Sequence, residues 1–210
     1  DKEKLGSGLP IIGKFGVGLK DALATFHRNG VEVVIRSNHG TFTLKQVSKH
    51  GFDNIITLHV EFDDAPVPIQ GTDFVLTGVS DAEMAGARAL FLRFSKEEVL
   101  DTTSYGAIIR RNPQTAKVYI LGVLASDEPN FLFSYNITSL TEAMKKRLNR
   151  ERLNVGRTTY TDRIKTILRS ANSAAVHVEL VEQVGIRAFG DQRDEMQWIE
   201  ISQLALNLMH

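Results

Sequence analysis

The stretch IIGKFGVGLKDAL, residues 11–23, is the most informative part of the chain. It places Gly13, Gly16 and Gly18 behind two isoleucines and directly ahead of an amphipathic run. A helix start leaves about four backbone N–H groups unpaired and carries a partial positive charge, and glycines before it let the main chain approach an oxyanion closely. The segment therefore predicts a phosphate site, and the alternative is a tight glycine turn packed against a strand.

Apolar residues at helical spacing predict a helix from Val17 to about Arg28, ended by Asn29-Gly30. Alternating apolar and polar residues then predict four strands. The strands are residues 31–37, 41–47, 54–62 and 71–79, with a hairpin turn at 38–40 and a Pro-rich loop at 63–71. Ser80 and Glu83 form a capping-box pattern, which predicts a helix running to about Phe94.

The second half of the chain also mixes strands and helices. We expect a helical turn at 95–100, strands at 106–111, 117–125 and 131–138, and helices at 139–152 and 161–174. Residues 175–184 fit either a strand or a helix, and the C-terminal residues are predicted to end in a helix.

The composition is that of an ordinary soluble globular protein: 42% hydrophobic and 24% charged residues, with a formal net charge of +0. The 210 residues include no cysteine, which excludes disulfides, thiolate metal sites and a cysteine nucleophile. No run of about 18 apolar residues occurs, so no membrane segment is predicted. We expect a cytoplasmic location, with the nucleus as the alternative. The abrupt start at Asp1 suggests a piece of a longer protein.

Two common phosphate motifs do not fit this stretch. A P-loop has Gly-Lys-Ser/Thr after four spacer residues, and the chain contains no such pattern. A Rossmann fingerprint follows a full strand and precedes an acidic residue at the end of the next one. Ile11-Ile12 is short for a strand, and the strand at 31–37 leads into Asn38 instead of an acid.

The string IGKFGVGLKDAL resembles the second glycine box of the GHKL ATPases, the superfamily of gyrase B, the heat-shock chaperone ATPases, histidine kinases and MutL. The form is most similar to that of chaperone-like and MORC-like members, in which a G-x-F-G-x-G segment caps the triphosphate. The strand GTDFVL at 71–76 is similar to the later G-T-x-v-x-l strand of that superfamily. The resemblance covers about residues 5–95.

The resemblance implies an α+β fold: a two-layer α/β sandwich of Bergerat type, with helices on one face of a mixed, mostly antiparallel sheet. Residues 1–100 would form the C-terminal part of an ATP-binding domain, and residues 101–210 a smaller α/β extension or transducer-like region. The superfamily's earlier Glu/Asn helix and Asp-x-Gly-x-Gly loop are absent from this chain. We therefore expect no hydrolysis and weak or no ATP binding from this piece alone, and we assign no catalytic residue.

The resemblance also implies a set of nucleotide contacts, for ATP with Mg²⁺ as the cofactors. The residues are Gly13, Lys14, Phe15, Gly16, Val17, Gly18, Leu19, Lys20 and Thr72. Thr72 would lie beside the adenine end, and the alternative for it is a strand residue chosen for β propensity.

A basic segment at 145–169 contains nine Lys or Arg residues against two acidic ones, a local charge of +7 that leaves −7 for the rest of the chain. Arg150, Arg152 and Arg157 have planar guanidinium groups suited to phosphate, so one role is sensing the γ-phosphate. A second is contact with nucleic acid, and a third is a solvated helix face with internal ion pairs.

The leading hypothesis for function is an ATP-binding module that acts as a nucleotide-gated conformational switch, with a homodimer as a possible product of closure. One alternative is a nucleic-acid-binding module that uses the basic segment, and another is an interaction scaffold with a degenerate, non-hydrolysing fold. The six histidines are scattered without metal-ligand spacing, so no metal site is predicted within the chain.

Overall fold

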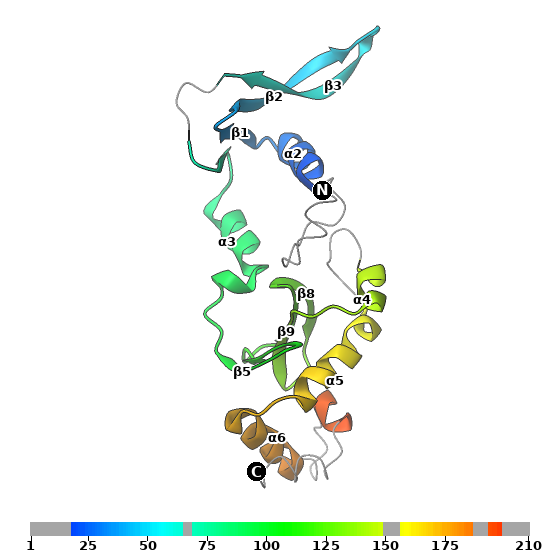
Figure 1. Cartoon of the computed structure of the whole chain (residues 1–210). Coiled ribbons are helices and arrows are strands. Elements are labelled where there is room, and N and C mark those ends of the chain that lie inside the picture. Colours follow the sequence, from blue (N-terminus) through cyan, green and yellow to red (C-terminus); the bar gives the residue numbers. More distant parts are fainter. Residues whose placement is uncertain (1–17, 65–68, 149–155, 187–192, 199–210) are drawn as a thin grey trace. The chain divides into compact units, whose positions relative to one another are not determined.

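The computed structural model describes residues 18–64, 69–148, 156–186 and 193–198 (Figure 1). The chain divides into two compact units, whose described residues are 18–85 and 86–198. Each unit contains its own sheet together with helices, so the coarse expectation of a mixed α+β fold is confirmed. The Bergerat-type arrangement is not confirmed.

The first unit is a helix followed by an antiparallel sheet. The helix is α2 (Gly18–Arg28), and the strands are β1 (Glu32–Ser37), β2 (Gly40–Lys49), β3 (Phe52–Asp63) and β4 (Thr72–Thr77). The strand order is β3-β2-β1-β4, with every neighbouring pair antiparallel. All five elements lie close to their predicted positions, and Gly30, at a φ of 72°, ends the helix as expected.

The strand register separates an apolar face of this sheet from a polar one. The side chains of two paired residues point to the same face of a sheet, and the side chains of successive residues point to opposite faces. Ile35 is opposite Phe42 in β2 and Phe74 in β4, and Phe42 is in turn opposite Phe62 in β3. Helix α2 lies on the same apolar face: its His27 is 3.0 Å from Gln46, whose Cα partner is Leu58. The opposite face carries the ion pair between Lys45 and Glu61, at 2.8 Å.

Helix α3 (Asp81–Ala89) begins with the predicted capping box. The Ser80 hydroxyl accepts from the Glu83 N–H at 3.3 Å, and the Glu83 carboxylate accepts from the Ser80 N–H at 2.9 Å. The Ser80 N–H and the Ser80 hydroxyl both donate to the Glu83 carboxylate and so lower the pKa of Glu83. The helix is shorter than predicted, because a bridge at Phe91 and the 3-10 turn η1 (Leu92–Phe94) follow it.

The second unit has a mixed five-stranded sheet with the order β5-β6-β9-β7-β8. Its strands are β5 (Val99–Thr103), β6 (Gly106–Arg110), β7 (Ala116–Ile120), β8 (Val123–Glu128) and β9 (Phe133–Ile137). β7 and β9 run parallel, and the other neighbouring pairs are antiparallel.

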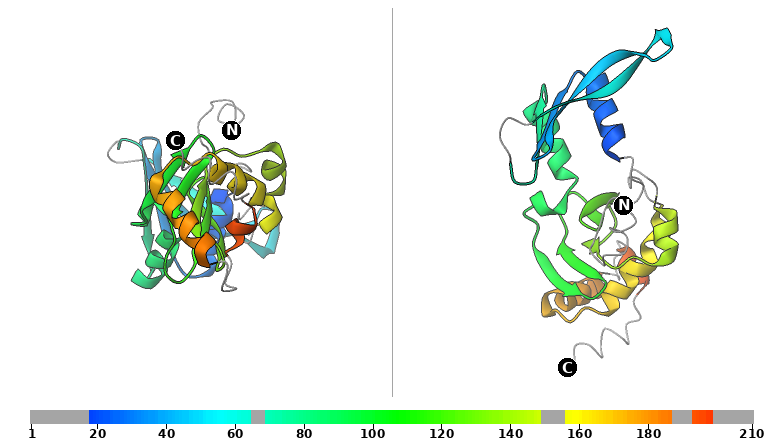
Figure 2. Two further views of the ribbon diagram at one scale, coloured as in Figure 1. Left: turned by 90° about the horizontal axis from the view of Figure 1, so that it is seen from below. Right: turned by 45° about the horizontal axis from the view of Figure 1, so that its top comes forward.

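Helices cover one face of this second sheet and complete its core. They are α4 (Glu142–Arg147), η2 (Arg157–Thr159), α5 (Thr161–Arg169), α6 (Ala174–Ile186) and the turn η4 (Asp194–Gln197). Ile108 and Tyr135 from the sheet pack with Ile164, Leu180 and Met196 from these elements, and all five side chains are buried. Figure 2 (left) shows α6 lying across strands of this sheet.

Two local predictions for the second unit need correction, and one alternative left open by the sequence is decided. Residues 117–125 were expected to be one strand, but a turn at Leu121-Gly122, both with positive φ, divides them between β7 and β8. Residues 95–100 contain no helical turn and lead into β5. Residues 175–184 are helical, because the Asp101 carboxylate accepts from the N–H groups of Asn172 and Ser173, at 2.7 and 2.9 Å, immediately before α6.

Candidate functional site

The described part of the glycine-rich segment begins at Gly18, which is the first residue of α2. Gly13, Lys14, Phe15, Gly16 and Val17 lie outside the described residues. Gly18, Leu19 and Lys20 form the first turn, and all three are exposed. A Cβ added at Gly18 would meet no atom within 4 Å, so the space beside this turn is open.

The sequence of α2 explains how the middle and the C-terminal end of the helix are held in place. Leu23 is buried, as is Val33 on β1, and the Asn29 N–H donates to the Thr25 carbonyl at 3.1 Å to close the C-terminal end. The first turn carries Lys20, which favours an anion, and Asp21, which stabilises the positive helix end but competes with an external anion.

Thr72 is the first residue of β4 and is exposed. It is opposite Ser37, at the end of β1, and follows Gly71, whose φ of 89° marks the turn into the strand. These contacts describe an ordinary strand start, and among the described residues the Thr72 hydroxyl has no hydrogen-bond partner.

Among the three arginines proposed to sense phosphate, Arg150 and Arg152 lie outside the described residues. Arg157 pairs with Asp194 and, at 3.3 Å, with Glu128, and its guanidinium lies 4.7 Å from the centre of the Phe131 ring. A phosphate would have to displace two carboxylates to use this guanidinium. The observed contacts instead connect η2 with η4 and with the end of β8.

Other cations of the basic segment also have partners within the second unit. Lys145 pairs with Glu142 at 2.7 Å, and Lys165 pairs with Asp162 at 3.6 Å. The Arg163 guanidinium lies 5.1 Å from the centre of the Tyr105 ring. A nucleic acid would therefore compete with the chain's own carboxylates along this segment.

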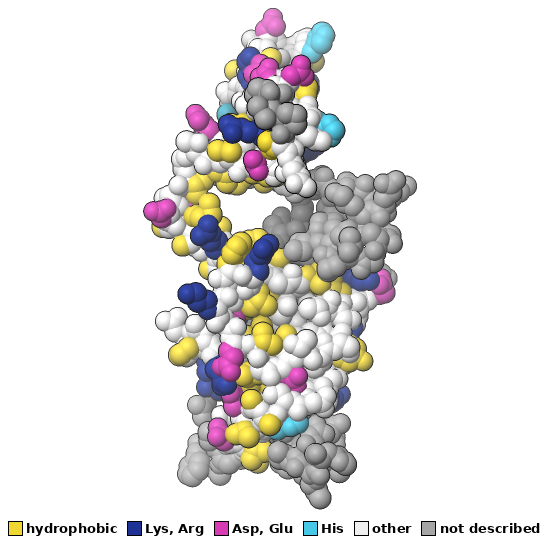
Figure 3. All heavy atoms as spheres, turned by 60° about the vertical axis from the view of Figure 1, so that its left-hand side comes forward, with side chains coloured by type: hydrophobic (Ala, Val, Ile, Leu, Met, Phe, Trp, Pro, Cys, Tyr) yellow, Lys and Arg dark blue, Asp and Glu magenta, His cyan; other side chains and the backbone are white. Residues whose placement is uncertain are grey.

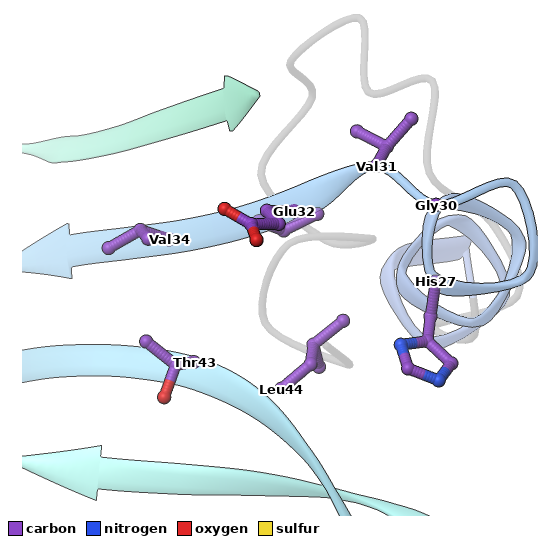
Figure 4. Close-up of a pocket in the computed structure, with 8 residues that line it drawn as sticks. His27, Gly30, Val31, Glu32, Val34, Thr43 and Leu44 are labelled. Carbon is purple, nitrogen blue, oxygen red and sulfur yellow. The ribbon is translucent and has the colours of Figure 1, made fainter. Parts of the chain in front are cut away.

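A cleft of about 420 Å³ lies in the first unit where the C-terminal end of α2 meets β1 and β2 (Figure 4). Its lining includes His27, Gly30 and Glu32, together with Val31, Val33, Val34, Thr43 and Leu44. His27 is nine positions after Gly18, a separation of roughly 14 Å along a helix. The cleft is therefore at the other end of α2 from Gly18.

The sequence analysis did not single out Glu195, the best-connected buried carboxylate in the described part of the chain. Its side chain is 0% exposed and accepts from the Leu132 N–H at 2.8 Å, the Phe133 N–H at 3.2 Å and the Tyr135 hydroxyl at 3.0 Å. Burial raises the pKa of Glu195, against the opposing effect of these donors. This carboxylate attaches η4 to β9. Its partners lie about sixty residues earlier, so no local pattern predicts the contact.

The described residues contain no cluster of three or more His, Cys, Asp or Glu side chains placed to hold a metal ion. Among the same residues, no helix combines the length and apolar character needed to cross a bilayer.

Comparison with known proteins gives relatives for part of the chain. Residues 82–174, which are mostly in the second unit, match the family described as the Mycoplasma pneumoniae MPN635 N-terminal domain. An uncharacterized protein of Mycoplasma pneumoniae (strain ATCC 29342 / M129 / Subtype 1) is 35% identical over 161 residues, which are 76% of this chain and 65% of the relative. A second uncharacterized protein of the same strain is 27% identical over 138 residues, or 64% of this chain and 38% of the relative. No solved structure matches the chain.

These comparisons overturn the resemblance to the GHKL ATPases. The matching family and relatives carry no GHKL or ATPase signal. The resemblance depended on one glycine-rich segment and one short strand. A glycine turn before any helix also produces such a pattern, and a Gly-Thr start is common to many strands. The adenine contact predicted for Thr72 depended on this resemblance and therefore has no remaining support. The prediction of an anion beside α2 depends on backbone chemistry and is unaffected.

Proposed function

We propose that residues 13–20 bind the phosphate chain of a nucleotide, with ATP and Mg²⁺ as the expected ligands, and that binding acts as a conformational switch. The observation that carries the proposal is the position of Gly18, which is both the last glycine of the segment and the first residue of α2. The unpaired N–H groups of a helix start are thus directly continuous with Gly13 and Gly16 in the chain. Hydrolysis is no part of the proposal.

The helix is suited to this role because its middle and its C-terminal end are anchored while its first turn is exposed. With 11 residues it forms about three turns, and Leu23 and the Asn29-Gly30 ending hold it against the sheet. An anchored helix presents its partial positive charge without first being ordered by the ligand, which reduces the entropic cost of binding.

The two alternative functions have less support. Nucleic-acid binding would use a segment in which Lys145, Arg157 and Lys165 already pair with carboxylates of the same unit. An interaction scaffold requires no nucleotide and is compatible with the exposed apolar side chains of the first unit. A salt titration separates nucleic-acid binding from nucleotide binding, because contacts with a phosphate backbone weaken steeply with salt.

The substitution Gly18→Asp tests the proposal without damaging the fold. A carboxylate in the first turn stabilises the helix end but repels a bound phosphate. We expect the affinity for ATP with Mg²⁺ to fall about tenfold or more, while the melting temperature stays equal or rises. The measurement is fluorescence titration with a labelled ATP analogue, together with a melting curve of each protein.

Gly86→Asp is the matched control. Gly86 also lies in a helix, is exposed and has no atom within 4 Å of an added Cβ, so it receives the same charge in a similar environment. We expect unchanged nucleotide affinity for this variant. Equal affinity for Gly18→Asp and the wild type would show that the helix start takes no part in binding.

A further inference from the structure

Strand β3 forms one edge of the sheet in the first unit and, in the described part of the chain, pairs only with β2. Its 12 residues span about 40 Å. Figure 2 (right) shows β2 and β3 as a long two-stranded hairpin. The outer side of β3 therefore offers a row of backbone N–H and C=O groups for another strand.

Two of the devices that protect an edge strand, proline and lysine, are missing from β3, although the strand carries three acidic residues and its pairing with β2 is irregular at Ser48 and Lys49. Its sequence, FDNIITLHVEFD, contains neither proline nor lysine, and it is long where protected edges are short. The apolar side chains Ile56, Val60 and Phe62 are 65%, 56% and 50% exposed. Figure 3 shows such hydrophobic side chains at the surface among charged ones. The opposite edge, β4, is only six residues long.

We propose that β3 pairs with β3 of a second copy of this chain, antiparallel and about a two-fold axis at Val60. In this register Val60 is opposite Val60 of the second copy, and Leu58 is opposite its Phe62. These pairs all belong to the apolar face of the sheet. On the polar face, His59 is opposite Glu61 and Thr57 is opposite Asp63, and each pair occurs twice by symmetry.

The pairing of apolar with apolar residues, and of the acidic side chains with hydrogen-bonding partners, favours both this partner and this register. A shift by one residue places apolar side chains opposite polar ones, because side chains alternate between faces. A shift by two residues in one direction places Glu61 opposite itself, and like charges directly opposite each other are destabilising. A shift by two in the other direction places His59 opposite itself, and both His59–Glu61 pairs are lost. The axis at Val60 therefore gives the two edges the best match of apolar and charged residues among these neighbouring registers. Glu61 would bridge Lys45 of its own chain, at 2.8 Å, and His59 of the second copy.

A single cysteine tests the axis directly, since the chain contains no cysteine of its own. In the proposed dimer the Cα atoms of the two Val60 residues are about 4.5–5.5 Å apart, within the range that a disulfide bridges. We expect Val60→Cys to form a covalent dimer on mild oxidation, seen on a non-reducing gel.

Ile56→Cys is the matched control, on the same strand and the same face and even more exposed. The two positions 56 would be eight residues apart along the paired strands, about 26 Å, so no cross-link is expected. Absence of cross-linking at position 60, or equal rates at both positions, would overturn the proposal.

Charge reversal provides a second, non-covalent test. We expect His59→Glu to weaken dimerisation about tenfold in sedimentation equilibrium, because it places two Glu–Glu pairs across the seam. Adding Glu61→Lys to His59→Glu places opposite charges across the β3–β3 contact again. It also places opposite charges within each chain, because position 59 is paired with Lys45 of β2.

His39→Glu, in the turn between β1 and β2, is the control and should leave dimerisation unchanged. A wild-type chain that stays monomeric up to about 1 mM would contradict the proposal. Neither test depends on nucleotide, so failure here is distinguishable from failure of the phosphate site.

Discussion

Glu195→Ala is expected to lower the free energy of unfolding of the second unit by about 4 kcal/mol, among the largest effects of any single substitution in the chain. The carboxylate accepts from the N–H groups of Leu132 and Phe133 and from the Tyr135 hydroxyl, and the last two are buried. Each donor left without a partner in a buried position costs about 1–3 kcal/mol. Removing the side chain also detaches η4 from β9.

The measurement is urea unfolding followed by the fluorescence of Trp198, the chain's single tryptophan. Its ring contacts Phe131 at a centroid distance of 5.3 Å, so it reports on the same unit. Glu182→Ala, an exposed glutamate on α6, is the control and should change stability by less than about 0.5 kcal/mol. A loss below about 1 kcal/mol for Glu195→Ala would mean that water or another group replaces the carboxylate.

Glu195 also predicts a pH dependence with a definite sign. Burial raises its pKa above the ordinary value of 4.5, so the folded unit binds its proton more tightly than the unfolded chain does. The stabilisation is therefore complete below about pH 4.5 and is lost as pH rises through the folded-state pKa. We expect stability relative to Glu195→Gln to fall with rising pH across this window, measured by urea unfolding at each pH. A difference that rises with pH would show a lowered pKa.

Gly106→Ala is the second substitution with a large expected effect. A Cβ at this position would lie 2.2 Å from the carbonyl oxygen of Asn136 and 2.8 Å from Cδ1 of Ile167. Asn136 is backbone of β9, which pairs with β6 in the middle of the sheet, so the strand cannot move aside without breaking hydrogen bonds. We expect a loss of about 4 kcal/mol or more in the unfolding free energy.

The test compares thermal unfolding and soluble yield of this variant with Gly156→Ala. Gly156 lies before η2, where an added Cβ meets no atom within 4 Å, so the same substitution should be harmless. Equal melting temperatures for the two variants would mean that the approach of β6 to β9 at Gly106 is looser than the structure describes.

The sequence predicted the first unit well because local signals there agree with the fold. The helical spacing of apolar residues in α2, the Asn29-Gly30 ending and the alternation in β1 and β2 each specify one structure. Ser80 and Glu83 likewise form their capping box within four residues, so the start of α3 needs no distant contact.

Predictions failed where distant contacts or unusual turns decide the structure. The turn between β7 and β8 includes Leu121, which has a φ of 53° inside an otherwise continuous apolar run. The start of α6 depends on Asp101, about seventy residues earlier. Glu195 has no local signature because all its donors come from β9 and the residue before it.

The site was predictable only in part, for a related reason. A glycine pattern indicates an exposed helix start and therefore a site for an anion, because both depend on the chemistry of the backbone. It carries little information about ancestry, and the comparisons gave a match of residues 82–174 to the MPN635 N-terminal domain and no signal of the GHKL ATPases. The glycine pattern likewise does not specify which base the nucleotide carries.

Direct binding of nucleotide to the wild-type chain is the most decisive measurement. We predict saturable binding of radiolabelled ATP in equilibrium dialysis, one molecule per chain, strengthened by Mg²⁺ and displaced by inorganic tripolyphosphate. Displacement by GTP as well would define a site that recognises phosphates without selecting the base. If neither ATP nor tripolyphosphate binds up to about 1 mM, the claim that the glycine segment and α2 hold a phosphate chain is wrong.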